Sequence, residues 1–374
     1  MMKVAVISRG IPTPTYPLNG IFEWDQAKAL AQKGLQVAFV VIDFRSGSFK
    51  RKYGLLRYQR EGIQVFELSL PINVYRKALP LLRQLLRIPF RAMLKSFGKP
   101  DVLHAHFYSI AAIASTLGRR YGIPFLITEH SSKLNRPAEQ ISALDKKLAA
   151  TAYASCDLLI SVSETLRQNL LRNFKQDSIV IHNMVDNHDF QFSDQAKNES
   201  PFVYVSVGNL TPLKAFDQLI DAFSQVKDDA RLLIIGEGPE RTRLEAQIRQ
   251  LGLQEQVCLL GQQPHPEINR IFQQSHVFAL ASRSETFGLS YIEALYAGLP
   301  VIATRCGGPE SFVNDENGLL TPVDDIPALA QAMKTIRKDY HRFNRQQLSA
   351  SCLQQFAPDK IADQLIEAYR STRV

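Results

Sequence analysis

The stretch from Ser282 to Glu310, SRSETFGLSYIEALYAGLPVIATRCGGPE, constrains the fold of this chain more than any other. It predicts a loop that turns into a helix near Gly288, then a buried strand over Leu299–Ala303, then a second loop. Gly288 lets the backbone approach a ligand closely, and the N–H groups at a helix start suit phosphate. This order of elements predicts a nucleotide-type site at the carboxyl ends of parallel strands.

Two glutamates of this stretch, Glu285 and Glu293, are separated by seven residues. Residues eight apart on one helix differ by about 80° around its axis. If Glu285 precedes the helix and Glu293 lies two turns in, both carboxylates can approach one ligand from different heights. Two solvated glutamates on a surface helix are the plain alternative.

The pattern resembles the signature of retaining nucleotide-sugar glycosyltransferases of the GT-B fold, the group 1 type. The resemblance covers nearly the whole chain, most strongly over 203–320 and more weakly over 1–190. It implies an α/β protein of two Rossmann-like domains facing a cleft, the first binding the acceptor and the second the activated sugar. The residues that carry the signature are Glu285, Phe287-Gly288, Glu293-Ala294, Gly298, Pro300-Val301 and Gly307-Gly308-Pro309-Glu310.

Length and charge also predict two domains in this chain of 374 residues. Residues 1–190 hold 26 Lys and Arg against 14 Asp and Glu, whereas residues 191–374 hold 18 against 22. We expect an N-terminal domain over 1–190 and a C-terminal domain over 191–357, with a polar linker at 194–200. The last segment, 358–374, is expected to form a helix that packs back on the N-terminal domain.

Composition argues against several other classes. No apolar run reaches the roughly 18 residues of a membrane-spanning helix, and the N-terminus predicts a first strand and not a signal peptide. The four cysteines lie far apart without a CxxC motif, which is typical of free thiols in a reducing compartment. The loop after the first strand lacks GxGxxG, and no DxD motif lies in a suitable loop. We therefore expect a cytoplasmic protein without a dinucleotide cofactor or a metal ion.

The resemblance implies a donor-binding set for the nucleoside diphosphate and its sugar. Asn209 and Lys214 match the family's diphosphate contacts, and a cation there stabilises the charge that develops on the leaving group. Ala215 stands where relatives carry glycine. Glu285 would reach the sugar hydroxyls and Glu293 the ribose. The full donor-binding set is Gly20, Asn209, Lys214, Gly236, Gln262, Phe287, Gly288, Leu289 and Glu293.

Two histidines complete the predicted site from the first domain. His104 and His106 share one side of a short strand because side chains alternate, and His106 lies at the carboxyl end, where open α/β sheets bind ligands. The resemblance implies that His106 lies near the reacting sugar and that His130 lies on the acceptor side. The predicted catalytic residues are His106, Lys214 and Glu285. The family's front-face reaction needs no separate base, since the leaving phosphate takes the acceptor proton.

The least ordinary segment, Leu68–Pro100, contains no acidic residue. Its basic residues repeat every four positions beside an apolar side, as in a helix that lies on an anionic membrane surface. A solvated basic face is the alternative. Nucleic acid is not an expected partner, because no recognition motif is visible. The residues expected to meet the membrane are Arg83, Arg87, Arg91 and Lys95.

Together these features predict a glycosyltransferase that acts on a glycan or lipid-linked acceptor in cell-envelope polysaccharide synthesis, at the inner face of the cell membrane. One alternative is a synthase with a soluble sugar acceptor. Another is a non-catalytic module that binds a nucleotide sugar or nucleic acid. The residues do not specify the donor base, the sugar, the acceptor or the linkage.

Overall fold

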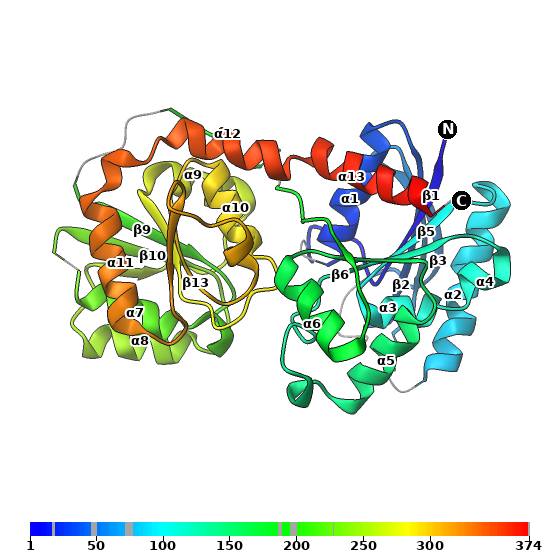
Figure 1. The fold of residues 1–374 in the computed structure, drawn as a ribbon, viewed down its shortest axis with the longest axis horizontal. Helices are drawn as coiled ribbons and strands as arrows, with labels where there is room; N and C mark the ends of the chain where they lie inside the picture. Colours follow the sequence, from blue (N-terminus) through cyan, green and yellow to red (C-terminus); the bar gives the residue numbers. More distant parts are fainter. Residues whose placement is uncertain are drawn as a thin grey trace. The chain divides into compact units, whose positions relative to one another are not determined.

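The structure, a computed structural model, describes residues 1–16, 19–45, 51–71, 78–185, 189–194, 200–226 and 228–372. The chain divides into two compact units, 1–184 with 358–374, and 185–357 (Figure 1). Most of the predicted linker, residues 195–199, lies outside the described residues.

The first unit is built on an eight-stranded sheet with the order β3-β4-β2-β1-β5-β6-β7-β8. All neighbouring strands are parallel except β3 and β4. Its strands are β1 (Lys3–Ser8), β2 (Gln36–Asp43), β3 (Gly54–Arg60), β4 (Ile63–Ser69), β5 (Val102–His106), β6 (Phe125–Glu129), β7 (Leu158–Ser161) and β8 (Ile179–Val180). Its helices are α1 (Ile21–Gln32), α2 (Leu79–Ser96), α3 (Tyr108–Ala114), α4 (Leu117–Tyr121), α5 (Ala143–Tyr153), α6 (Glu164–Phe174) and α13 (Pro358–Ser371).

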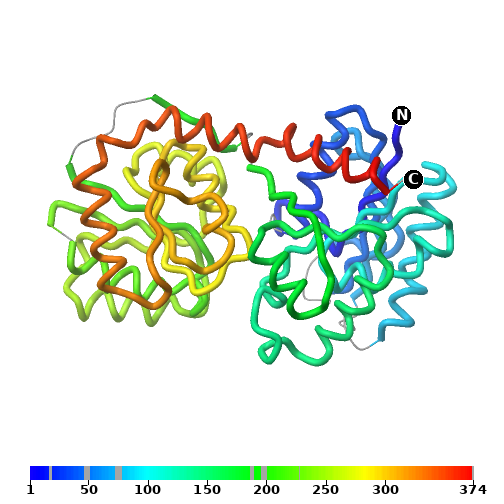
Figure 2. The backbone as a smooth tube through the Cα atoms, viewed as in Figure 1, coloured from blue at the N-terminus to red at the C-terminus, as the bar shows by residue number. Residues whose placement is uncertain are grey.

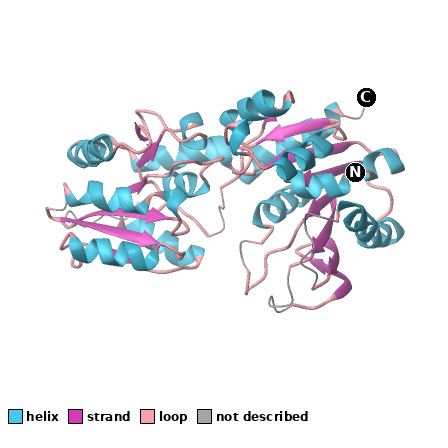
Figure 3. Cartoon of the chain, turned by 90° about the horizontal axis from the view of Figure 1, so that it is seen from below, coloured by secondary structure: helices cyan, strands magenta, loops and turns pink. Residues whose placement is uncertain are grey.

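The second unit is built on a six-stranded parallel sheet with the order β11-β10-β9-β12-β13-β14. Helices cover both of its faces (Figure 3). Its strands are β9 (Phe202–Val207), β10 (Ala230–Ile235), β11 (Val257–Leu259), β12 (Val277–Leu280), β13 (Val301–Thr304) and β14 (Gly318–Thr321). Its helices are α7 (Phe216–Ser224), α8 (Arg241–Gln250), α9 (His265–Gln274), α10 (Leu289–Tyr296), α11 (Ile326–Lys338) and α12 (Arg345–Phe356).

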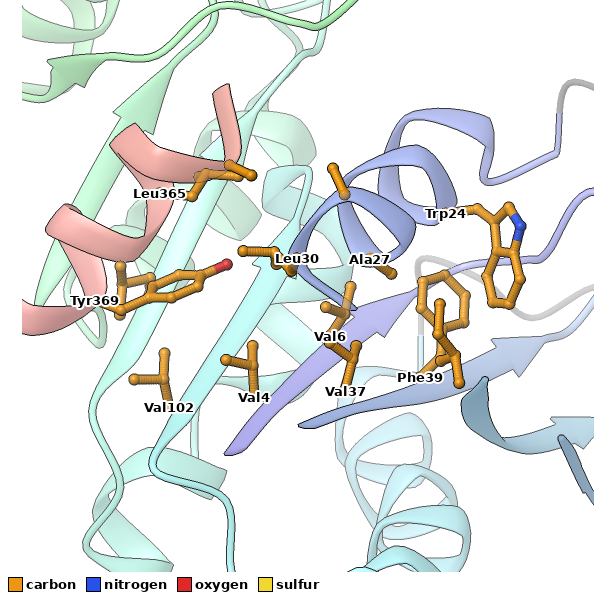
Figure 4. Packing of buried hydrophobic residues seen from close by; sticks show 14 of the residues in the cluster. Val4, Val6, Trp24, Ala27, Leu30, Val37, Phe39, Val102, Leu365 and Tyr369 are labelled. Atoms are coloured by element: carbon orange, nitrogen blue, oxygen red, sulfur yellow. The ribbon is translucent and has the colours of Figure 1, made fainter. Parts of the chain in front are cut away.

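The last helix, α13, belongs to the core of the first unit although it follows the whole second unit in the chain (Figure 2). Its apolar side packs beside α1 on the face of the sheet that carries Val4 and Val6 (Figure 4). Leu365 and Tyr369 are fully buried there. Burying side chains of this size contributes about 1.5–3 kcal/mol each, so α13 closes this core.

Two elements differ from the expectation for the basic first half of the chain. Strand β3 was not predicted; it forms a hairpin with β4 through Glu61 and Gly62, both with positive φ, a turn that matches the twist of paired strands. Helix α2 continues from Leu79 to Ser96 through Pro89, although a proline inside a helix removes one backbone hydrogen bond and usually kinks or divides it. Pro89 is buried against the unit, so packing holds the helix together there.

Candidate functional site

Three loops of the second unit meet at the carboxyl ends of β9, β10 and β11. The backbone N–H of Gly236 donates to the carbonyl oxygen of Gly261 at 2.8 Å. A Cβ added at Gly236 would lie only 1.9 Å from the carbonyl oxygen of Gly208, so these two loops are in direct backbone contact. Asn209, Gly236 and Gln262, three of the predicted donor-binding residues, therefore lie at one edge of the sheet.

The loop after β9 ends in a strained residue. Ala215 begins α7 in the left-handed conformation, with φ 48° and ψ 43°, and it is fully buried. This conformation costs an alanine roughly 1–2 kcal/mol relative to the right-handed one. Alanine at this position therefore adopts the left-handed turn at a cost in strain. Lys214 is placed immediately before this turn.

Lys214 and Glu285, two predicted catalytic residues 71 positions apart, are in contact. Lys214 Nζ donates to Glu285 Oε1 at 2.6 Å, and Ser282 Oγ donates to the same oxygen at 2.7 Å. The Glu285 side chain is 10% exposed and the Lys214 side chain 23%. The ion pair is therefore largely desolvated, and the ammonium group is its more exposed partner. It can turn from Glu285 to an anion that binds nearby.

Backbone hydrogen bonds fix the position of Glu285. Its N–H donates to the carbonyl oxygen of Cys306 at 3.0 Å, and its own carbonyl accepts from the N–H of Gly308 at 2.9 Å. A Cβ added at Gly308 would lie 2.2 Å from the carbonyl oxygen of Phe287. Burial and the Glu285 carboxylate raise the pKa of Cys306 to about 12, so this thiol stays protonated.

Helix α10 starts directly after this loop. Gly288 is its N-cap with φ 100°, and no side chain caps this end. Because that φ is not helical, the helix begins at Leu289 and Glu293 lies one turn into it, not two as expected. Phe287, Gly288 and Leu289 thus surround an uncapped helix start, the arrangement that suits phosphate. Glu293 is buried, and its carboxylate helps to raise the pKa of Cys352 on α12.

In the first unit, Gly20 begins α1 with φ 77°. A Cβ added there would lie 2.3 Å from the carbonyl oxygen of Gly10, so only glycine fits. Two residues later, the ring of Phe22 stacks on the ring of His130, with centroids 5.3 Å apart. The loop that carries Gly20 is thereby brought to the end of β6.

The two histidines of β5 and His130, directly after β6, form two hydrogen-bonded sets. His104 and His106 lie on the same side of β5, as predicted from alternation, with ring centroids 4.4 Å apart. His104 is bonded to Tyr369 Oη and Thr128 Oγ1, both at 2.7 Å. His106 Nδ1 lies 3.0 Å from His130 Nε2. The structure therefore brings the two predicted acceptor-side histidines together.

These histidines are held neutral. Burial lowers the pKa of His104 to about 3 and that of His130 to about 3. The pKa of His106 is lowered well below its usual range by burial and by its two histidine neighbours. Among the described residues, His106 Nε2 has no hydrogen-bond partner. A buried ring nitrogen without a partner is costly, which favours a ligand there.

The residue directly after His106, Phe107, has a strained backbone conformation. Phe107 has φ 63° and ψ 137° and begins α3, and such a conformation costs a non-glycine residue about 1–3 kcal/mol. The guanidinium of Arg9, at the end of β1, lies over the Phe107 ring at 4.4 Å. Arg9, Ser282 and Glu129 were not predicted as part of the site. A polar residue at a strand end was the available signal for each of them.

The basic residues predicted to share one face of α2 differ in their exposure. Arg83 donates to the Ala112 carbonyl and, at 2.8 Å, to Ser115 Oγ, so its guanidinium is bound within the unit. Burial lowers the pKa of Arg83. A different stripe, spaced three and four residues apart, is exposed along the helix. Its members are Leu81, Gln84, Ile88, Arg91 and Lys95.

Two features are absent from the described residues. None of the helices there is long and apolar enough to cross a bilayer. Those residues also contain no group of three or more His, Cys, Asp or Glu side chains that could hold a metal ion.

Two family models together match residues 24–352 of the chain. The model of Glycosyltransferase Family 4 matches residues 24–189, and the model of Glycosyl transferases group 1 matches residues 187–352. The chain belongs to the group 1 glycosyltransferases. The second match contains every predicted donor-site residue except Gly20.

Curated relatives of this glycosyltransferase include enzymes of different pathways. The chain is 26% identical over 286 residues to N-acetyl-alpha-D-glucosaminyl L-malate synthase of Bacillus anthracis, covering 72% of this chain and 74% of that one. It is 26% identical over 363 residues to a putative teichuronic acid biosynthesis glycosyltransferase of Bacillus subtilis, covering 89% and 88%.

Solved structures show that this glycosyltransferase has the GT-B fold. Sucrose-phosphate synthase from Thermosynechococcus elongatus superposes with a TM-score of 0.81 at 21% identity, over 99% of each chain. HepE of Anabaena in complex with UDP-glucose superposes with a TM-score of 0.76 at 20% identity, over 99% of this chain and 100% of that one.

Proposed function

We propose that this chain is a retaining, hexosyl-type glycosyltransferase that moves a sugar from a nucleoside-diphosphate sugar to an acceptor hydroxyl without a metal ion. The observation that carries the proposal is the contact between Lys214 and Glu285 beside the uncapped start of α10. An ammonium group and a helix N-terminus at one sheet edge suit a diphosphate. The complex of HepE with UDP-glucose supports a nucleotide-sugar donor.

Each second-unit residue then has a defined role. Lys214 turns from Glu285 to the diphosphate and neutralises the charge that develops as the sugar bond breaks. Asn209 contacts the same diphosphate, and the N–H groups from Phe287 to Leu289 bind its terminal phosphate. Glu285, released from Lys214, accepts hydrogen bonds from the sugar hydroxyls. Glu293 accepts hydrogen bonds from the ribose.

The acceptor side belongs to the first unit in this proposal. His106 binds a hydroxyl through Nε2, and His130 lies behind it. The leaving phosphate takes the acceptor proton on the face where the new bond forms, which gives retention. A cation supplied by Lys214 does the work that a metal ion does in other transferases.

The acceptor is proposed to be a lipid-linked or anionic glycan of the cell envelope, met at the cytoplasmic face of the membrane. The teichuronic acid relative supports this choice of pathway. Helix α2 supports the location, because its exposed stripe pairs Leu81 and Ile88 with Arg91 and Lys95. A Lys or Arg near an anionic surface contributes about 1 kcal/mol.

Vesicle flotation tests the membrane part. The protein should float with vesicles of anionic phospholipid at low salt, and an Arg91→Glu/Lys95→Glu variant should not. The matched control is Lys146→Glu/Lys147→Glu, which reverses two exposed charges on α5 of the same unit. Absence of flotation at low salt would refute membrane binding.

The donor assay tests the reaction itself. Purified protein in EDTA is given UDP-, GDP- and ADP-sugars, and nucleotide release and thermal shift are measured. One donor should stabilise the protein and release its nucleotide. Both effects should be lost in Lys214→Ala and kept in Lys334→Ala, an exposed lysine of the same unit. No response to any donor, with or without lipid extract, would overturn the proposal.

A synthase with a soluble sugar acceptor is the second candidate. The superposition on sucrose-phosphate synthase and the similarity to glycogen synthase of Mycobacterium tuberculosis favour it. Nucleotide release that requires a soluble sugar or sugar phosphate, and not lipid extract, would select this function. The anomeric configuration of the product, measured by NMR, tests retention in both cases.

A further inference from the structure

Glu129, at the end of β6, accepts four hydrogen bonds in a fully buried position. Its Oε1 accepts from the backbone N–H groups of His130 at 3.0 Å and Ser131 at 2.9 Å. Its Oε2 accepts from the backbone N–H of Tyr108 and from Tyr153 Oη, both at 2.8 Å. All four partners are donors, so both carboxylate oxygens are used.

These bonds join the ends of two neighbouring strands. Tyr108 is two residues after His106 at the end of β5, and it follows the strained Phe107. His130 directly follows β6. One carboxylate therefore holds the backbone on both sides of the His106–His130 contact. Burial raises the pKa of Glu129, and the hydrogen bonds from Tyr153 and the three N–H groups oppose that shift.

The contact itself couples the two rings. Two neutral imidazoles 3.0 Å apart share one proton, since one nitrogen must donate and the other accept. If His106 Nδ1 carries the proton, its Nε2 is an acceptor and His130 Nδ1 is a donor. The other tautomer reverses both roles. The outer nitrogens of the pair thus always have opposite polarity, which matches a hydroxyl group and not an anion.

Neither outer nitrogen has a hydrogen bond of ordinary geometry to any residue that the structure describes. The Asn183 side chain is close enough to His130 to favour its charged form, and burial outweighs that effect. The pair is therefore preorganised, and His106 Nε2 is the polar atom that it leaves for a ligand.

We propose that Glu129 is a positioning residue that holds His106 and His130 as one hydroxyl-binding pair with a shared proton. The role of the pair toward a sugar hydroxyl rests on the proposed function. The positioning by Glu129 does not, because it concerns the geometry of the protein without substrate.

Glu129→Gln tests the positioning. The amide replaces one acceptor oxygen by a donor, which then faces either Tyr108 N–H or the N–H groups of His130 and Ser131. One strand end must move. Tyr153→Phe is the milder variant, since it removes one of the four bonds and leaves the backbone contacts.

The first measurement is NMR of protein carrying ¹⁵N-histidine, with the pair assigned through His106→Gln. Wild type should show one exchange-protected imidazole proton between the two rings. Glu129→Gln should lose that protection, and Tyr153→Phe should shift the signal. An unchanged signal in Glu129→Gln overturns the proposal. If that variant does not fold, an unchanged signal in Tyr153→Phe overturns it.

The second measurement is steady-state kinetics with the donor found above. Misplacing a reacting group by about 1 Å costs on the order of 10²-fold, so kcat of Glu129→Gln should fall by that factor while KM for the donor stays constant. The control is Glu67→Gln, another buried carboxylate of the same unit, which accepts from Tyr58 Oη at 3.0 Å.

An equal loss of kcat in both variants would show a general loss of stability and overturn the proposal. If wild type transfers no sugar at all, the proposed function fails, and the NMR result still decides the role of Glu129.

Discussion

Replacing Lys214 by methionine should lower the free energy of unfolding of the second unit by about 2 kcal/mol. At 2.6 Å and an effective dielectric constant of about 20, the attraction between Lys214 and Glu285 is about 6 kcal/mol before desolvation is counted. Breaking a fully buried pair costs about 3–5 kcal/mol and breaking an exposed one about 0.2–1 kcal/mol. The pair lies between these limits, since its side chains are 23% and 10% exposed.

Methionine keeps the aliphatic stem and removes the charge, so it isolates the electrostatic part. Glu285 then keeps the hydrogen bond from Ser282 Oγ and loses the one from the ammonium group. Glu285→Gln should cost less than Lys214→Met, because the ammonium group is more exposed and can be hydrated. In the double variant the uncompensated charge disappears. The coupling energy of the cycle should therefore be about 1–2 kcal/mol, within the range for residues in contact.

Urea denaturation provides the assay. The single tryptophan, Trp24, lies in the first unit, so its fluorescence reports on that unit and serves as an internal control. Far-UV circular dichroism follows both units. The matched pair is Arg283–Asp324, with a contact of 2.7 Å between side chains that are 32% and 53% exposed. Removing Arg283 should cost less than about 1 kcal/mol and depend more on salt.

A coupling energy below about 0.5 kcal/mol, the usual error of additivity, would refute the reasoning. Equal costs for the Lys214 and Arg283 variants would do so as well, since they would mean that burial does not strengthen the pair. A saturating nucleoside diphosphate should reduce the coupling, because Lys214 then binds phosphate in place of Glu285.

Three further predictions concern single groups. His104 and His130 have pKa values of about 3 in the folded chain, below the roughly 6.5 of the unfolded chain, so these two residues alone should lower stability by about 2.7 kcal/mol between pH 7.5 and 5.5, measured by urea denaturation, and His106, whose pKa is also lowered, adds to this fall. Gly288→Ala should cost at least about 2 kcal/mol, seen as a lower Tm, because φ is 100° and the new Cβ would lie 2.8 Å from the buried Tyr291 ring. Ala215→Gly should change stability by less than about 1 kcal/mol, because relief of roughly 1–2 kcal/mol of strain offsets the lost methyl burial and the greater entropy of the unfolded chain.

Each of these predictions has a control variant or a result that would contradict it. His341→Gln, at an exposed position, should leave the pH profile unchanged, and a profile flat from pH 7.5 to 5.5 would contradict the assignment of neutral buried histidines. A Gly288→Ala protein as stable as wild type would show that the start of α10 can shift. Ala222→Gly, inside α7 at an equally buried position, should cost about 1 kcal/mol or more. A similar cost at Ala215 would mean that its conformation is not strained.

Much of the sheet structure was predictable because apolar runs bounded by glycine or polar residues are local signals. The buried strand predicted over Leu299–Ala303 forms as β13, Val301–Thr304, within two residues of the expected bounds. The edge strand β3 was missed because its sequence, GLLRYQR, has no regular alternation of apolar and polar residues and is mostly exposed, so only its turn at Glu61-Gly62 marked it. Helix α12 was also not predicted, since its sequence has no strong apolar side.

The candidate site divides in the same way. The spacing of Glu285 and Glu293 and the glycine at 288 were visible in the sequence, because spacing and backbone freedom are properties of a short segment. Contacts between segments that are distant in the chain were not visible in the sequence. Such contacts arise only when parallel strands end at one edge of a sheet. They include the Lys214–Glu285 pair, the bond of Tyr369 to His104 across 265 positions, and the hydrogen bonds that Glu129 accepts.

The sequence by itself therefore determined which residue types were available, where the strands and turns lie, and the family to which the chain belongs. The tertiary structure decided which charges are paired, which histidines are neutral, and which arginine of α2 is bound within its unit. The physical reason is that hydrogen bonds and desolvation depend on neighbours in space. Those neighbours come from strand order and from helix packing, which no short segment encodes.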